Sequence, residues 1–212
     1  MYCLADSSES SLLVCIHCTC YYFISKNRFC IVSLEEKTLI YDQDEDVLIR
    51  DLENADARII TEEEIAQGWH QSIEKYENRL RDRDAGKCVS LAAEYRGKVA
   101  GYINVYPNSQ WGAFGNRGLP EIVDFGVLEK YRNRGIGTKL MDAAESIAAK
   151  YAGTVYLGVG LHSGYGSAQR MYVKRGYIPD GSGVWYGDRP CEPYAPCENG
   201  DELVLYLSKK LK

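Results

Sequence analysis

The sequence has no excess of positive charge, no apolar run long enough to cross a membrane, and only three histidines. Its 25 Lys and Arg are outnumbered by 30 Asp and Glu, which gives a net charge of -5. Nucleic-acid-binding domains usually present a basic face, so this charge balance argues against that class. The longest apolar run, residues 11–25, has about 15 residues, whereas a spanning helix needs roughly 20. We therefore expect no membrane span, although a weak N-terminal anchor is left open.

A secretory signal is also lacking, because Asp6 and Glu9 precede the apolar run and no basic segment opens it. Eight cysteines are present, five of them in the first 30 residues. The stretch "CIHCTC", residues 15–20, holds a C-x-x-C around His17, but no second ligand pair follows at zinc-site spacing. We therefore expect no metal site and no disulfide framework, and we expect a cytoplasmic location.

The first 45 residues do not read as part of the fold that follows. They hold most of the cysteines and the apolar run, and no methionine lies between Met1 and Met141. We expect residues 1–45 to be a poorly ordered N-terminal extension or a translated upstream region. The domain is expected to span residues 46–212.

The body of the chain alternates between strand-like and helix-like patterns. Residues 46–52 read as a first strand, and residues 87–95 and 99–107 as a hairpin turned at Gly97. Between them a T-x-x-E pattern at Thr61 and Glu64 predicts a capping box. A helix is expected behind it with one apolar face, formed by Ile65, Trp69, Ile73, Tyr76 and Leu80.

The second half continues the alternation. Strands are expected at residues 121–128, 154–161 and 201–210, with a strand beginning at residues 176–178. Helices are expected at about residues 135–150 and at 167–175, and loops at 107–120 and 180–200. There are no internal repeats. This order predicts an α/β (α+β) fold with a mixed, mostly antiparallel central sheet of about seven strands flanked by helices.

The stretch "YRNRGIGTKL", residues 131–140, places two glycines at the start of the helix expected from Gly135. The first N–H groups of a helix lack internal partners and carry the positive end of the helix dipole. Without a Cβ, Gly135 and Gly137 allow a phosphate to come close to the backbone, and Arg132 and Arg134 add positive charge. The physical interpretation is a pyrophosphate cradle, and the alternative is a helix start that happens to contain glycines.

Two common phosphate-binding loops do not match this stretch. A Walker A loop needs G-x-x-x-x-G-K-[ST], and "GIGTKL" lacks that spacing. A Rossmann fingerprint needs a third glycine, where Leu140 stands, and an acidic residue at the end of the next strand, which reads "GVGLH".

The stretch "VLEKYRNRGIGTKLM" resembles the acyl-CoA-binding motif R/Q-x-x-G-x-G/A of the GCN5-related N-acetyltransferase (GNAT) family, at Arg132, Gly135 and Gly137. A second signature, N-x-x-A-x-x-L-Y-x-x-x-G-F, is similar to "YGSAQRMYVKRGY". Ala168, Tyr172 and Gly176 match it, whereas Tyr165 replaces the usual Asn. The resemblance covers about residues 46–210. It implies the acyl-CoA N-acyltransferase (GNAT) fold.

The resemblance implies acetyl-CoA as the acetyl donor, lying in the splay between the strands at 121–128 and 154–160. The backbone N–H groups of residues 134–138 would hold its pyrophosphate, and the main chain near Phe125 and Val127 would pair with the pantetheine. The expected cofactor-binding residues are Phe125, Val127, Arg132, Arg134, Gly135, Ile136, Gly137, Thr138 and Ala168.

Direct attack of an amine on the thioester needs a base for the amine and benefits from an acid for the leaving thiolate. Tyr172 stands where many family members carry that acid. For the base we expect Glu121 first and Asp124 second, with a structural carboxylate as the alternative in each case. Strand alternation places Glu121 on one face with Val123, Phe125 and Val127, and Asp124 on the other. His70 and His162 are weaker candidates.

The implied function is an N-acetyltransferase acting on a primary amine, and we favour a small-molecule acceptor. Aromatic residues and the acidic groups Glu192, Glu198 and Asp201 in the expected acceptor loops would suit a cationic amine. The alternatives are a protein N-acetyltransferase and an acyl-CoA-binding sensor with little catalysis. Dimers are common in the family, so a homodimer is left open.

Overall fold

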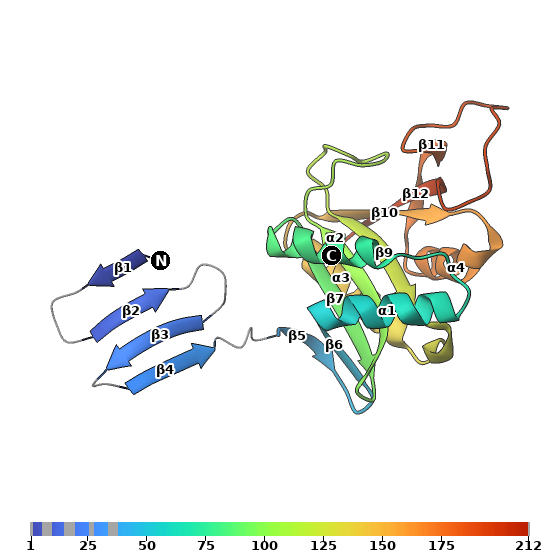
Figure 1. Ribbon diagram of the computed structural model, residues 1–212. Coiled ribbons are helices and arrows are strands. Elements are labelled where there is room, and N and C mark those ends of the chain that lie inside the picture. Colours follow the sequence, from blue (N-terminus) through green and yellow to red (C-terminus); the bar gives the residue numbers. More distant parts are fainter. Residues whose placement is uncertain (1, 6–9, 15–19, 26–27, 34–37, 212) are drawn as a thin grey trace. The chain divides into compact units, whose positions relative to one another are not determined.

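The computed structural model describes residues 2–5, 10–14, 20–25, 28–33 and 38–211, and the chain divides into two compact units, Met1–Thr38 and Leu39–Lys212. The first unit is an antiparallel sheet in the order β1-β2-β3-β4, drawn in blue in Figure 1. Its strands are β1 (Tyr2–Ala5), β2 (Ser10–Val14), β3 (Cys20–Ser25) and β4 (Arg28–Ser33). The C-x-x-C stretch around His17 lies outside the described residues.

The second unit is built on one eight-stranded sheet in the order β11-β12-β10-β9-β8-β7-β6-β5. Neighbouring strands are antiparallel except for β9 and β10, which are parallel. The predicted mixed, mostly antiparallel sheet is therefore confirmed. Its strands are β5 (Ile40–Gln43), β6 (Val47–Asp51), β7 (Val89–Tyr95), β8 (Lys98–Tyr106), β9 (Glu121–Val127), β10 (Thr154–Gly160), β11 (Ile178–Tyr186) and β12 (Leu203–Lys210).

The sheet has one strand more than the sequence predicts, because β5 pairs antiparallel with β6 from Ile40 to Gln43. The second unit consequently begins at Leu39 rather than at residue 46. Strand β5 is short, half-exposed and acidic, so its sequence lacks the apolar alternation by which strands are recognised. That the residues before Leu39 are poorly ordered stays a prediction.

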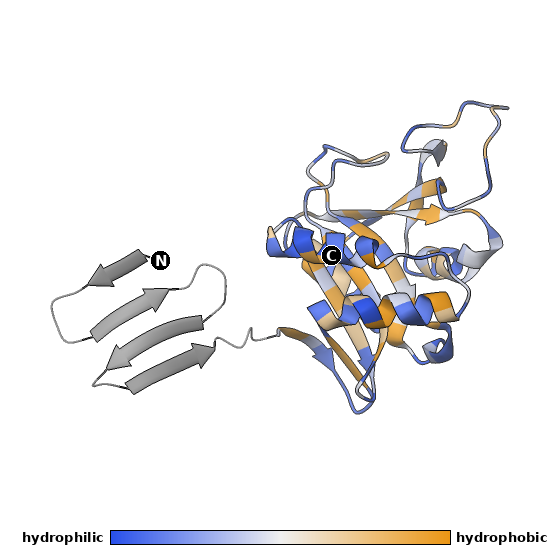
Figure 2. Ribbon diagram, viewed as in Figure 1, coloured by the Kyte–Doolittle hydropathy of each residue, from blue (hydrophilic) through white to orange (hydrophobic). Residues whose placement is uncertain are grey.

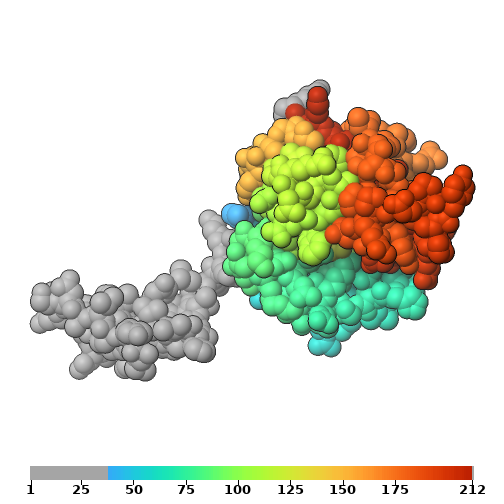
Figure 3. Space-filling view, turned by 90° about the horizontal axis from the view of Figure 1, so that it is seen from above, coloured from blue at the N-terminus to red at the C-terminus, as the bar shows by residue number. Residues whose placement is uncertain are grey.

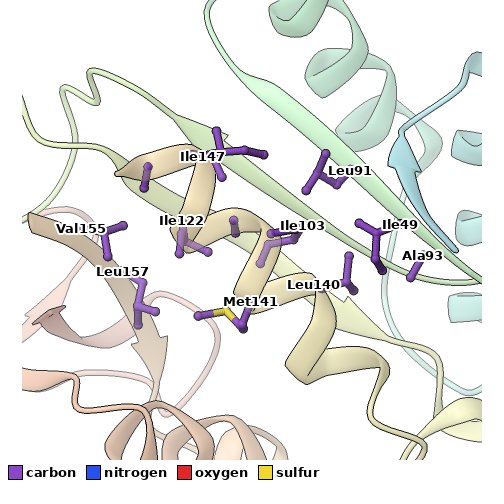
Figure 4. Packing of buried hydrophobic residues seen from close by; sticks show 14 of the residues in the cluster. Ile49, Leu91, Ala93, Ile103, Ile122, Leu140, Met141, Ile147, Val155 and Leu157 are labelled. Carbon is purple, nitrogen blue, oxygen red and sulfur yellow. The ribbon is translucent and has the colours of Figure 1, made fainter. Parts of the chain in front are cut away.

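Helices cover both faces of the sheet (Figure 1). On one face α1 (Asn54–Ala66) and α2 (Ile73–Asp84) enclose a cluster with Ala92, Val99 and Tyr102. On the other face α3 (Ile136–Ala148) buries Ile136, Leu140, Met141, Ala144 and Ile147 against the strands (Figure 4). Hydrophilic and hydrophobic residues alternate along α1 and α2, as expected for helices with one buried side (Figure 2). Helix α4 (Gly166–Lys174) follows β10.

The single helix expected behind Thr61 is two helices. Gly68 has φ 89°, which ends α1, and α2 begins only at Ile73. Thr61 and Glu64 are not a capping box, because both lie inside α1 and are buried. The Asp56 carboxylate instead accepts a hydrogen bond from the backbone N–H of Glu53, the residue that caps α1.

Most other predicted elements are confirmed, including the hairpin of β7 and β8, with Arg96 and Gly97 at positive φ in its turn. The loop expected at 180–200 begins later, because β11 extends to Tyr186. Its register with β12 is interrupted between Pro179 and Val184, so the alternation that signals a strand is lost there. No helix among the described residues is both long enough and apolar enough to span a bilayer.

The packing of α3 predicts the cost of a cavity in this core. Leu140 is fully buried, so Leu140→Ala should lower the free energy of unfolding by about 2–5 kcal/mol. Urea denaturation of the full chain measures this, with Ile65→Ala as control because Ile65 is 55% exposed at the end of α1. Equal losses in the two variants would contradict the assignment of α3 to the core.

Candidate functional site

Strands β9 and β10 separate soon after they meet. Their parallel pairing covers only two residue pairs, Tyr156 with Glu121 and Leu157 with Ile122. Beyond these pairs β9 continues beside β8, and β10 continues beside β12 up to Gly160. The two strands therefore leave an opening in the middle of the sheet, from residue 123 on one side and residue 158 on the other. Backbone groups of both strands that would otherwise pair with each other border this opening.

A β-bulge lies at the start of the opening. Asp124 has φ 52°, and the register between β8 and β9 shifts between Tyr102 and Asn104. Glu121 and Val123 are opposite Tyr106 and Asn104 and so face the α1–α2 side. Val127 is opposite Gly101 and faces α3, as does Phe125.

The prediction that Glu121, Val123, Phe125 and Val127 share one face is therefore wrong. The bulge inserts one residue into β9 and reverses the alternation after Val123. Asp124, expected on the face opposite Glu121, contacts α2 and so lies on the same side as Glu121.

The predicted phosphate cradle is a tight loop between β9 and α3. It contains a short 3-10 helix, η1 (Glu129–Tyr131), then Asn133 at φ 60° and Gly135 at φ 79°. Gly135 caps α3, and the first backbone bond into that helix runs from the Lys139 N–H to the Gly135 carbonyl, 3.1 Å. The N–H groups of Ile136, Gly137 and Thr138 precede this bond, so an anion at the helix start can accept from them.

The two glycines have different roles. Gly135 adopts a left-handed conformation with open space around it, so it is required for its backbone angle. At Gly137 an added Cβ would lie 3.1 Å from the Phe125 ring and 3.6 Å from Val127. Gly137 thus allows α3 to start directly against β9 at the opening, where a side chain would intrude.

Arg132 and Arg134 flank the cradle, exposed and held by aromatic rings. The Arg132 guanidinium lies 5.5 Å from the Trp69 ring and donates to the Val127 carbonyl, 3.3 Å. The Arg134 guanidinium lies 5.0 Å from the Tyr95 ring. These contacts keep two positive charges beside the start of α3. Thr138 is exposed on the first turn, whereas the Ile136 side chain is buried in the core.

Tyr172 lies on α4 and is 5% exposed. Its ring centroid is 6.4 Å from that of Phe125 and 5.8 Å from that of Tyr177. Burial raises the pKa of its phenol, so the hydroxyl keeps its proton at neutral pH. Ala168 is half-buried one turn earlier. Because Phe125 also lies against Gly137, these contacts connect Tyr172 to the cradle through one shared side chain.

Glu121 is 7% exposed at the closed end of the opening. One carboxylate oxygen accepts hydrogen bonds from Ser109 Oγ, 2.5 Å, and from the Tyr156 hydroxyl, 3.3 Å. Burial raises the pKa of this carboxyl to about 7, although both hydrogen bonds act in the opposite direction. Glu121 can therefore exchange a proton near neutral pH.

Asp124 is held in an ion pair. Its carboxylate lies 2.6 Å from Arg79 Nε and 3.6 Å from Lys75 Nζ, both on α2. Arg79 also donates to the Tyr106 hydroxyl, 2.7 Å. This arrangement favours a structural carboxylate that fixes the bulge to α2.

His162 is occupied on both ring nitrogens. Nδ1 accepts from the Gly164 N–H, 3.1 Å, which leaves Nε2 to donate to Asp201, 3.1 Å. Asp201 also accepts from the Tyr165 hydroxyl, 2.9 Å. His162 therefore positions Asp201, while His70 is exposed after α1.

Two loops cover the side of the opening where Glu121 lies, 107–120 and 187–202. They are joined by a hydrogen bond from the Gly112 N–H to Asp188, 2.8 Å. Gly112 also approaches the Tyr206 ring so closely that a Cβ would overlap it. Figure 3 shows the first loop in yellow-green beside the second in red-orange.

Comparisons with known proteins agree with this geometry. The model of the acetyltransferase (GNAT) family matches residues 49–177. An uncharacterized N-acetyltransferase of Chlorobaculum tepidum is 26% identical over 170 residues, covering 76% of this chain and 95% of that protein.

Solved structures have the same fold. One is yncA of Salmonella typhimurium, a proposed acetyltransferase with its cofactor acetyl-CoA, at 18% identity and a TM-score of 0.57, covering 79% of this chain and 95% of that one. Another is a Salmonella typhimurium acetyl transferase that modifies the N-terminal serine of ribosomal protein L7/L12, at 10% identity and a TM-score of 0.61, covering 82% and 100%.

The chain belongs to the GNAT acetyltransferase family. Its activity is therefore acetyl transfer from acetyl-CoA to an amine acceptor. The residues fit this cosubstrate, because the first N–H groups of α3, with Gly135 and Gly137, would hold its pyrophosphate beside an opening between two strands. The acetyl-CoA supplies the acetyl group as a thioester.

Sequence reasoning missed several residues around this GNAT site, namely Lys75, Arg79, Ser109 and Tyr156. Tyr156 was open to detection, because Val155, Leu157 and Val159 form the core side of β10 and leave Tyr156 on the other face. Ser109, Lys75 and Arg79 belong to no sequence motif that would have identified them. Among the described residues, no three His, Cys, Asp or Glu side chains gather as metal ligands.

The cradle predicts the effect of a large acidic residue at its centre. Gly137→Glu should abolish acetyl-CoA binding, because the side chain would meet Phe125 and place a negative charge where the pyrophosphate binds. Isothermal titration with acetyl-CoA measures this. Gly153→Glu is the control, since nothing lies within 4 Å of a Cβ at that glycine. Unchanged binding in a folded Gly137 variant would refute the cradle.

Proposed function

We propose that this GNAT enzyme acetylates the primary amine of a small molecule by direct attack within a ternary complex, with Glu121 as the base and Tyr172 as the acid. The observation that carries the proposal is the buried Glu121 carboxylate with a pKa of about 7, beside the opening between β9 and β10. A cytoplasmic location remains part of the proposal, and a homodimer is left open.

The proposed base needs both proton affinity and access. A carboxylate with a pKa near the working pH is well matched to accept a proton from an ammonium group, directly or through water. Only one oxygen of Glu121 is used by Ser109 and Tyr156, so the other is available to a water. Asp124 is less suited because two cations contact it.

The proposed acid lies on the opposite side of the sheet, beside Phe125. Tyr172 keeps its proton at neutral pH and its hydroxyl has no hydrogen-bond partner among the described residues. It can therefore donate to a thiolate that leaves through the opening. Base and acid on opposite faces let the amine enter from the α2 side while the thiolate is protonated on the other.

A small acceptor is favoured by the two joined loops. The bond between Gly112 and Asp188 closes loop 107–120 against loop 187–202 on the Glu121 side, which restricts the path for a folded protein surface. The protein N-acetyltransferase and the acyl-CoA sensor are the alternatives. Incubation with labelled acetyl-CoA and a pooled amine library that includes peptides tests these alternatives. Labelling of peptides alone would favour a protein N-acetyltransferase, and no labelled product would favour the sensor.

The pKa of Glu121 predicts the pH dependence of the reaction. The base must be ionised, so kcat/KM should rise with pH and level off above about 7. Glu121→Gln should lose this rise and about 100-fold or more in kcat, while acetyl-CoA affinity changes little. The pH–rate profiles of both proteins decide the matter. A retained rise in the variant would remove Glu121 as the base.

Removal of the Tyr172 hydroxyl tests the acid. Tyr172→Phe should lower kcat at least about tenfold, since proton donation contributes roughly that much or more, and leave acetyl-CoA binding unchanged. Tyr177→Phe is the matched control, a buried tyrosine whose ring lies beside that of Tyr172. If the two variants turned over equally fast, Tyr172 would have no part in the chemistry.

A further inference from the structure

Lys75 is a cation without a short ion pair in the described part of the chain. Its Nζ lies 3.6 Å from Asp124 and 3.4 Å from the Gln71 side chain, and the rings of Tyr76 and Tyr102 are 5.3 and 5.8 Å away. By contrast, Arg79 approaches the same Asp124 carboxylate to 2.6 Å. Arg79 thus neutralises Asp124, and the charge of Lys75 is left largely available.

The position of Lys75 is at the opening, on the face of Glu121. Asp124, its nearest carboxylate, is the bulge residue where β9 leaves β10. Asp201 lies across β10, just before β12. Hydrogen bonds from His162 and Tyr165 lower the pKa of Asp201, and the positive charge of Lys75 acts on this carboxyl in the same direction. Lys75 therefore lies beside the bulge residue that borders the opening.

Charged side chains lie on two sides of the opening. On the α2 side, Arg79 contacts the Asp124 carboxylate at 2.6 Å and Lys75 lies 3.6 Å from it, while Glu121 lies on the same face and Asp82 is paired with Lys87 at 3.1 Å. On the other side, one oxygen of Asp201 accepts from both His162 and Tyr165, and the side chain is 72% exposed. An amine entering from this face meets a cation on one side and a carboxylate on the other.

We propose that Lys75 binds a carboxylate carried by the acceptor next to its amine, so that the acceptors are free amino acids. Asp201 would attract the ammonium group before it loses its proton. One cation that lacks a short ion pair matches one carboxylate, whereas a phosphate dianion would exceed it. A polyamine would place its second positive charge near Lys75 and be repelled. The proposal rests on the small-molecule function above and adds a carboxylate to the cationic amine that the sequence suggests.

The test compares amino acids with the amines that differ from them only by loss of the carboxylate. Suitable pairs are alanine and ethylamine, leucine and isopentylamine, and phenylalanine and phenethylamine, with spermidine as a polyamine. The full chain should show a higher kcat/KM for the amino acid of the best pair. Lys75→Met should lower that value at least about tenfold, the usual effect of losing a charged hydrogen bond, and change the paired amine less than about twofold.

Charge variants separate binding from packing. Lys75→Arg should keep the preference for the amino acid, and Lys75→Glu should reverse it toward the amine and spermidine. Lys150→Met is the control, an exposed lysine after α3. Thermal denaturation establishes that each variant is folded.

The outcomes distinguish this proposal from the function on which it depends. Acetylation of amines that is as fast as that of amino acids would overturn the role of Lys75 and leave the small-molecule function standing. A preference for amino acids over amines that does not change with the charge at position 75 would have the same consequence. If the native protein bound acetyl-CoA and acetylated no amine of the panel, both proposals would fall.

Discussion

The separation of β9 from β10 after two residue pairs is the constraint on which the site depends. Parallel neighbours normally continue to pair, so something must direct β9 away. The bulge at Asp124 bends the strand, and Arg79 on α2 holds the bulge residue by an ion pair of 2.6 Å. Beyond the bulge, Gly126 lets β9 stay paired with β8 under the Tyr102 ring, because a Cβ there would meet that ring at 2.8 Å. The ion pair of Asp124 is therefore part of the architecture of the opening.

The burial of the Glu121 carboxyl has an energetic cost when the group is ionised. Its pKa of about 7 lies above its ordinary value, so ionisation is less favourable in the folded chain than in the unfolded one. The contribution of this group to stability is present at acid pH and is lost as the pH rises through about 7. A fold selected for stability alone would place an apolar residue at this position, whereas the base that we propose has to be ionisable.

The sequence predicts the strands and helices with strong periodicity and the cradle with its two glycines. It does not predict the break at Gly68, because Ile65 and Ile73 continue an apolar spacing although both are exposed. The bulge at Asp124 cannot be predicted from the sequence for a related reason. The two-residue alternation assigns strand faces on the assumption that no residue is inserted. One inserted residue changed the predicted face of every later residue in β9. The contacts of Lys75 and Arg79 require the packing of α2 on the sheet, which no local pattern contains.

The departure from the family signature at Tyr165 is explained by what its side chain contacts. Its hydroxyl donates to Asp201, its ring lies 4.6 Å from that of His162, and Gly160 lies so close that a Cβ would overlap the ring. An Asn is too short to fill this position and reach Asp201 from α4. Tyr165 therefore fastens the end of loop 187–202 to the start of α4 and holds the Asp201 carboxylate in place. The residue that departs from the family pattern thus shapes the side of the opening where we propose that the acceptor binds.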